Sequence, residues 1–204
     1  MKTPNQPLHV AFILYNQVEV LDLNGPLDVF VKANTLKPNT YIPYLVSATK
    51  EIVQTENGTT YILPQYSFDD CPKPDIVVVP GANPAIVMAY LKDEKFQQTY
   101  VQWIIKQHQQ GALLFTVCTG SLLLSTTSLF DGLDITTHFM GLEALQQLCP
   151  KANVLSGVRF IDQNHVLTTA GITAGIDGAL HLVSKQLTDE IGQTIKRLFE
   201  YHVS

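Results

Sequence analysis

Hydrophobic residues recur along the chain in short, nearly continuous runs that are separated by polar turns and by segments with helical spacing. Four runs, at 8–15, 41–48, 75–79 and 112–117, have the length of strands and contain few polar positions. Strands that are apolar on both sides are typical of a parallel sheet with helices on both faces. The pattern therefore predicts a sheet that is buried on both sides.

Segments with helical periodicity lie between these runs. A short helix is expected around 24–31, with Asn24 as its N-cap and Pro26 in its first turn. Further helices are predicted at 86–91, 96–105, 122–129, 139–149, 173–186 and 188–201. Because strand and helix alternate through most of the chain, we expect an α/β fold with a parallel sheet between helix layers.

Two β-hairpins are predicted in addition to that alternation. Asn57-Gly58 lies between two β-type stretches, and this dipeptide is the strongest short hairpin signal in the chain. Asn164-His165 lies between a second pair of such stretches, and a short strand is expected at 134–137. We interpret both hairpins as small insertions into the α/β unit.

The length of 204 residues suits one domain, and no linker, repeat or charge run divides the chain. We expect an N-terminal tail at 1–7 and a single domain at 8–204. The tail is polar and short, without the apolar core of a signal peptide. The uncharged segment 107–130 is not a membrane span, because 112–130 carries seven Ser or Thr residues. These features predict a cytoplasmic protein.

Composition narrows the class of partner. Charged residues make up only 15% of the chain and the net charge is −5, which argues against a surface that binds nucleic acid or anionic lipid. The spacing of Cys71, Cys118 and Cys149 matches no zinc pattern, and three cysteines cannot all pair with one another. Free thiols in a reducing compartment are the simplest interpretation.

Ligands of open α/β sheets collect where parallel strands end. Cys118 directly follows the predicted strand 112–117 and precedes a predicted helix, with Gly120 allowing a tight turn between them. A helix N-terminus at this point would lower the pKa of the thiol below about 8.5 and make it a nucleophile. The alternative is that Cys118 is a small hydrophobic residue that fills the end of a core strand.

Three further segments carry candidate chemistry. Asp22 lies between two leucines on a predicted strand-end loop, where it would share a proton with a nearby thiolate or simply cap a turn. His138 is either the base of a Cys–His pair or a hydrogen-bonded core histidine. The glycine-flanked turn 171–175 is explained by Thr173 as a helix N-cap, with a direct role in the site as the alternative.

The chain resembles the ThiJ/PfpI superfamily of cysteine-dependent, flavodoxin-like proteins, whose fold is also that of class I glutamine amidotransferases. This resemblance covers roughly residues 8 to 202 and is carried by the segments 75–81, 117–121 and 136–138. Three blocks are similar to the isocyanide hydratase branch, and also to the sensor halves of transcription regulators with an AraC-type DNA-binding region: Leu21–Val29, Cys118–Leu122 and Gly171–Asp177.

The resemblance implies roles for individual residues. Cys118 would be the nucleophile and Asp22 its acid partner. Backbone N–H groups from the turn of Gly81 and Ala82, and from Thr119, would line an anion site. Ile172 would pack against the helix that follows Cys118. His138 matches a family histidine that lies nearby without completing a working triad.

Two departures from the family pattern stand in the same segments. Many relatives have two glycines after the proline, whereas here Gly81 is followed by Ala82, so this chain departs from the family pattern at the anion site. The protease-like branch has a histidine where this chain has Thr119, which weakens a peptidase interpretation.

The leading functional hypothesis is a hydratase that converts an organic isocyanide into an N-formamide by covalent catalysis at Cys118. It implies a small-molecule substrate and requires no cofactor or metal. The resemblance and the low content of charged residues add the expectation of a homodimer. One alternative is a sensor domain whose Cys118 binds a small molecule or becomes oxidised. The other is a different superfamily reaction, such as glyoxalase activity or amide hydrolysis.

Overall fold

The computed structural model describes residues 6–202, so most of the predicted tail at 1–7 lies outside the described residues. A seven-stranded sheet forms the centre, in the order β10-β11-β7-β6-β1-β2-β5. Its strands are β1 (Leu8–Ile13), β2 (Tyr41–Ser47), β5 (Tyr66–Ser67), β6 (Ile76–Val79), β7 (Leu113–Thr116), β10 (Phe160–Asp162) and β11 (Val166–Thr169). All neighbours pair in parallel except β10 and β11. The predicted parallel α/β sheet is therefore confirmed.

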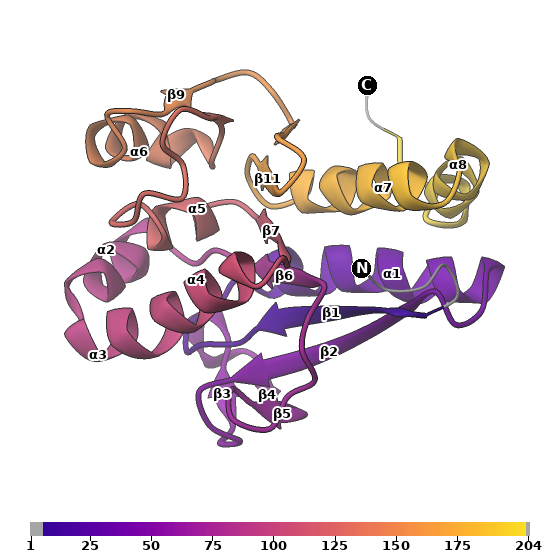
Figure 1. Cartoon of the computed structure of the whole chain (residues 1–204), viewed down its shortest axis with the longest axis horizontal. Coiled ribbons are helices and arrows are strands. Elements are labelled where there is room, and N and C mark those ends of the chain that lie inside the picture. The colour runs from indigo at the N-terminus through magenta and orange to yellow at the C-terminus, as the bar shows by residue number, and fades with distance from the viewer. Residues whose placement is uncertain (1–5, 203–204) are drawn as a thin grey trace.

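Helices flank the sheet in two groups. The helices are α1 (Val20–Leu36), α2 (Pro84–Lys92), α3 (Glu94–Phe96), α4 (Gln102–Gln109), α5 (Gly120–Leu123), α6 (Leu142–Leu148), α7 (Ala174–Gln186) and α8 (Asp189–Leu198). Helices α1, α7 and α8 pack together, and α2, α3 and α4 form a second group nearer β6 (Figure 1). Every residue of β6 is buried, as expected for a strand covered on both faces. Within the described part of the chain, no helix is long and apolar enough to cross a bilayer.

Helix α1 begins earlier than the sequence predicted. Its N-cap is Glu19, whose side chain accepts a hydrogen bond from the N–H of Leu21, so the prediction of Asn24 as N-cap is wrong. Pro26 lies inside the helix rather than in its first turn. The apolar residues before Asn24 belong to the helix, and Asp22 therefore lies in its first turn and not in a loop.

Helix α5 is much shorter than the predicted helix at 122–129, because it ends at Leu123. A run of Ser and Thr follows, and the hydroxyl of Thr127 donates to the carbonyl of Leu124 over 2.6 Å. Such local side-chain hydrogen bonds compete with helix formation. Cys118 is thus followed by a single helical turn, and the length of this helix bears on the protonation of the Cys118 thiol.

Both predicted hairpins form, but only one is an insertion. Strands β3 (Val53–Gln54) and β4 (Tyr61–Ile62) make a separate antiparallel pair, and Asn57 and Gly58 between them both have positive φ. The second hairpin joins β10 to β11, and β11 pairs with β7 in the central sheet, so it is part of the main architecture. A short parallel pair between β8 (Asp134–Ile135) and β9 (Asn153–Val154) lies beside it.

Candidate active site

The site lies where the strand order reverses. The central five strands follow the flavodoxin order 2-1-3-4-5, in which ligands bind beside the first strand at the carboxyl ends. Tyr15 follows β1, Gly81 follows β6 and Cys118 follows β7, so the segments after three parallel strands meet at this edge of the sheet. The predicted convergence of these segments is confirmed by the sheet order.

Cys118 occupies a sharp turn that several segments hold in place. Its φ is +57°, in the left-handed region. Its N–H donates to the carbonyl of Ala170 over 3.2 Å, and its own carbonyl accepts from the hydroxyl of Thr137 over 2.7 Å. A Cβ at Gly120 would lie 2.2 Å from the carbonyl oxygen of Val79, so only glycine fits the close approach of this turn to β6.

Burial dominates the electrostatics of the Cys118 thiol. The residue is 6% exposed, and loss of water contact raises its pKa to about 12, with a further increase from the negative charge of Asp22. Hydrogen bonds from the N–H groups of Ile172 and Thr119 act in the opposite direction. The predicted lowering of this pKa is therefore wrong, because a four-residue helix supplies little field and desolvation outweighs it.

Asp22 is a completely buried carboxyl beside this thiol. Its Oδ2 atom accepts the N–H of Gly81 over 3.0 Å, whereas no donor in residues 6–202 makes an ordinary hydrogen bond to its buried Oδ1 atom. Burial raises the pKa of Asp22 to about 7, and hydrogen bonding to Gly81 and to the Cys118 thiol opposes that rise. Near neutral pH the carboxyl is half ionised while the thiol keeps its proton, so the pair holds one proton above about pH 7.

Thr119 joins the Cys118 turn to the segment after β6. Its hydroxyl donates to the carbonyl of Ala82 over 2.7 Å and accepts the N–H of the same residue over 3.0 Å. The N–H groups of Gly81 and Ala82 are therefore already occupied, which corrects the expectation that they line an anion site. The donors that face the sulfur are instead the N–H groups of Thr119 and Ile172.

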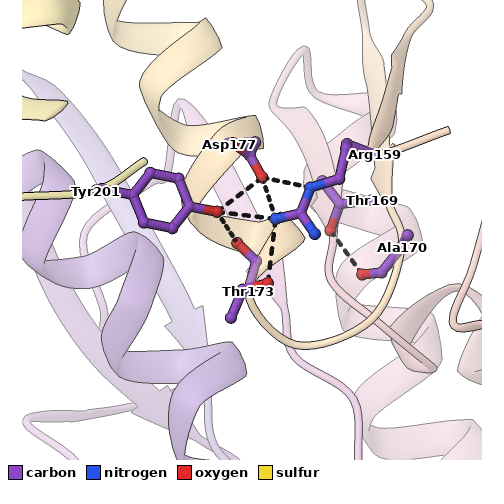
Figure 2. A network of polar contacts seen from close by, with 6 residues as sticks. All are labelled: Arg159, Thr169, Ala170, Thr173, Asp177 and Tyr201. Carbon is purple, nitrogen blue, oxygen red and sulfur yellow. Dashed lines mark hydrogen bonds and ion pairs between the residues drawn. The ribbon is translucent and has the colours of Figure 1, made fainter. Parts of the chain in front are cut away.

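Ile172 takes part in the site through its backbone. Its φ is +37°, and its side chain is 37% exposed and lines the same cavity as Cys118. The next residue, Thr173, is held by the polar network of Figure 2. Arg159 Nη2 donates to the hydroxyl of Thr173 over 3.1 Å and to that of Tyr201 over 2.8 Å, and it also bonds Asp177. The network fixes the start of α7, and with it the Ile172 N–H.

His138 lines the same cavity as Cys118, but its ring hydrogen-bonds to the backbone. Its Nδ1 atom accepts the N–H of Met140 over 3.3 Å and caps the turn that precedes α6. Burial lowers the pKa of its imidazole, so the ring is neutral at pH 7. The ring hydrogen bond found among the described residues thus goes to Met140, and the Cys–His pair considered from the sequence does not form.

Two acidic residues that the sequence did not single out border the sulfur. Glu19 and Glu56 line a cavity of about 140 Å³ together with Cys118. The remaining lining residues are Ala82, Asn83, Pro84, Thr119, His138 and Ile172. The Glu19 carboxyl hydrogen-bonds to Glu56 and raises its pKa to about 7, and both side chains help to raise the pKa of Asp22. No sequence signal marks them, because the β3–β4 hairpin brings Glu56 to the site.

The other two cysteines lie outside this cavity. Cys149 is buried and its pKa is raised to about 11 by desolvation, and burial also raises the pKa of Cys71. All three cysteines are free thiols. A search of residues 6–202 finds no group of three or more His, Cys, Asp or Glu side chains that could hold a metal ion.

Comparisons with known proteins agree with this geometry. The family model described as "DJ-1/PfpI family" matches residues 8–185. Isonitrile hydratase of Pseudomonas putida is 34% identical over 196 residues, covering 95% of this chain and 78% of that protein. The transcriptional regulator GbdR of Pseudomonas aeruginosa is 28% identical over 196 residues, and this chain spans 51% of its length.

A solved structure shows the same fold. The crystal structure of a ThiJ/PfpI family protein from Pseudomonas syringae superposes with a TM-score of 0.82 at 22% identity, covering all of this chain and 79% of that one. The matched family segment contains the strands that position Cys118 and Asp22. The chain therefore belongs to the DJ-1/PfpI family.

Proposed function

We propose that the protein is a hydratase that converts an organic isocyanide, R–N≡C, into the N-formamide R–NH–CHO. One observation carries the proposal: the buried Asp22 carboxyl is hydrogen-bonded to the buried Cys118 thiol beside a small cavity. The similarity to an isonitrile hydratase, isonitrile being a synonym of isocyanide, supports it.

The first step uses both members of the pair. Above about pH 7 the Asp22 carboxylate takes the proton from the Cys118 thiol as the sulfur bonds to the isocyanide carbon. Asp22 then gives that proton to the same carbon, whose lone pair accepts it, and the product is a thioimidate, R–N=CH–S. The N–H groups of Ile172 and Thr119 stabilise the negative charge that develops on sulfur during the transfer.

The second step adds water. The Asp22 carboxylate removes a proton from the water that attacks the thioimidate carbon, and it gives that proton to the nitrogen. The tetrahedral R–NH–CH(OH)–S intermediate then collapses, the C–S bond breaks, and the sulfur leaves with the hydroxyl proton returned through Asp22. Glu56, whose pKa is about 7, carries negative charge above that pH and repels anionic ligands from the cavity, so the site favours a neutral substrate.

Formamide production from an aryl isocyanide tests the proposal. The wild type should turn over the substrate, and Cys118→Ala should reduce the rate to the uncatalysed level. Cys149→Ala is the matched control, since it also removes a buried free thiol but lies outside the cavity. Equal rates for the wild type and Cys118→Ala would eliminate the mechanism.

A sensor domain is the second candidate, and the similarity to the regulator GbdR favours it, because 96% of this chain takes part in that match. In this case Cys118 would bind a small molecule or become oxidised without turnover. Intact mass after mild peroxide treatment separates the two candidates. Sulfenic or sulfinic acid confined to Cys118, together with no turnover of any isocyanide, would support sensing.

A further inference from the structure

A second cavity adjoins the one that holds the Cys118 sulfur. The inner cavity, lined by Cys118, has a volume of about 140 Å³, and the outer cavity, lined by Val158, has about 330 Å³. His138 and Ile172 belong to the walls of both. The two spaces are therefore neighbours on either side of the same two residues.

The inner cavity is too small for a whole aryl isocyanide. A cavity of roughly 150 Å³ is about the size that holds one benzene ring. An aryl isocyanide has the ring and, in addition, the nitrogen and carbon that must reach the sulfur. If the reactive carbon lies at Cys118, part of the organic group lies outside the inner cavity, and the outer cavity is the adjoining space beyond His138 and Ile172 that can receive it.

The walls of the outer cavity suit an uncharged group. Leu142, Val158 and Phe139 contribute apolar surface, and the Phe139 side chain is 75% exposed at its rim. Arg159 is the charged residue of this wall, and its guanidinium is already bonded to Asp177 and to the hydroxyl of Tyr201 (Figure 2). A neutral aromatic or branched alkyl group would therefore contact apolar side chains and the Arg159 guanidinium, whose charge is already paired with Asp177.

We propose that the outer cavity holds the organic group of the isocyanide while Cys118 attacks its carbon, and that Val158 limits the size of that group. This inference rests on the proposed hydratase function and adds a substrate class to it, namely neutral aryl or branched alkyl isocyanides. In this arrangement the reactive carbon occupies the inner cavity and the organic group lies beyond His138 and Ile172, which line both cavities.

The test compares a large and a small substrate in variants that fill the outer cavity. Val158→Trp narrows it from the loop before β10. Ser156→Trp narrows it from an exposed position, where the larger side chain replaces no buried packing. Ile52→Trp is the matched control, since Ile52 is 61% exposed and lines a different cavity. The measured quantity is the ratio of kcat/KM for 2-naphthyl isocyanide to that for methyl isocyanide.

We expect this ratio to fall tenfold or more in Val158→Trp and Ser156→Trp and to stay within twofold of the wild type in Ile52→Trp. One methylene in an apolar pocket already changes kcat/KM by about 10–200-fold. An unchanged ratio in both filling variants would overturn the proposal.

A second measurement keeps this result separate from the fate of the hydratase function. If the wild type turns over neither isocyanide, the proposed function fails. Alkylation of Cys118 by iodoacetamide and by N-(2-naphthyl)iodoacetamide, followed by intact mass, then reports on the cavity alone. A selective slowing of the naphthyl reagent in the two filling variants would support the outer cavity as the binding place of the organic group, and equal slowing of both reagents would reject it.

Discussion

Replacing Asp22 by Asn should make the protein more stable and catalytically inactive at the same time. The Asp22 carboxyl has a pKa of 3.8 in the absence of the fold and about 7 within it, because its site is buried. The folded state thus binds the proton more tightly than the unfolded state does. Stability from this group is fully present below about pH 4 and is lost as the pH rises to about 7.

The magnitude follows from the two pKa values. Each pH unit between them corresponds to about 1.4 kcal/mol, so ionised Asp22 lowers the free energy of unfolding by about 4 kcal/mol at most. Asn keeps an oxygen that can accept the Gly81 N–H and carries no charge. Asp22→Asn should therefore be more stable than the wild type at pH 8, while its rate of isocyanide hydration falls by about 10²–10⁴-fold.

Urea unfolding at a series of pH values measures this effect. The difference in unfolding free energy between Asp22→Asn and the wild type should grow by about 3 kcal/mol from about pH 4.5 to about pH 8. Asp28→Asn is the control on the same helix, because Asp28 is exposed and its ion pair with Lys32 contributes under about 1 kcal/mol. A difference that stays constant across this range would refute the raised pKa of Asp22.

Three further predictions concern the pH dependence of catalysis, the hydrogen bonds of Thr119 and self-association. The value of kcat/KM should rise about tenfold per pH unit below pH 7, as Asp22 ionises, and should level off above pH 7. A rise that continues to pH 10 would instead identify the free Cys118 thiolate as the reactive form. Thr119→Val leaves the buried N–H and C=O of Ala82 without their partner and should cost about 2–4 kcal/mol in urea unfolding, against little change for the exposed Thr126→Val. We also expect two copies of the chain to form a homodimer through the groove of about 560 Å³ that the half-exposed Leu21 and Val31 line. Sedimentation should then give a mass of twice 22.6 kDa, and a species of 22.6 kDa alone would contradict this.

The strands and the convergence of their ends at Cys118 were predictable because they depend on local patterns and on one rule of topology, whereas the pairing of Cys118 with Asp22 was implied by the family resemblance. Continuous apolar runs marked the buried strands, and parallel strands end at a common edge. The start of α1 was not predictable in the same way. Proline is typical of the first turn of a helix, whereas the structure accommodates Pro26 inside a helix of 17 residues.

The electrostatics of the site depended on burial, which a sequence does not show. A long helix after Cys118 would favour the thiolate, but Ser and Thr side chains end α5 after four residues, and desolvation prevails. Glu56 was missed for a related reason. It reaches the cavity because Val18 pairs with Thr55 of the hairpin segment and with Ala82, contacts between segments far apart in sequence.

The account depends most directly on a covalent bond between the Cys118 sulfur and the isocyanide carbon. Rapid-quench mass spectrometry during turnover of an aryl isocyanide tests it. The account predicts a transient mass increase equal to that of the isocyanide, located on the peptide that contains Cys118 and absent in Cys118→Ser. Steady formamide production by Cys118→Ser, or by a wild type that never carries this adduct, would contradict it.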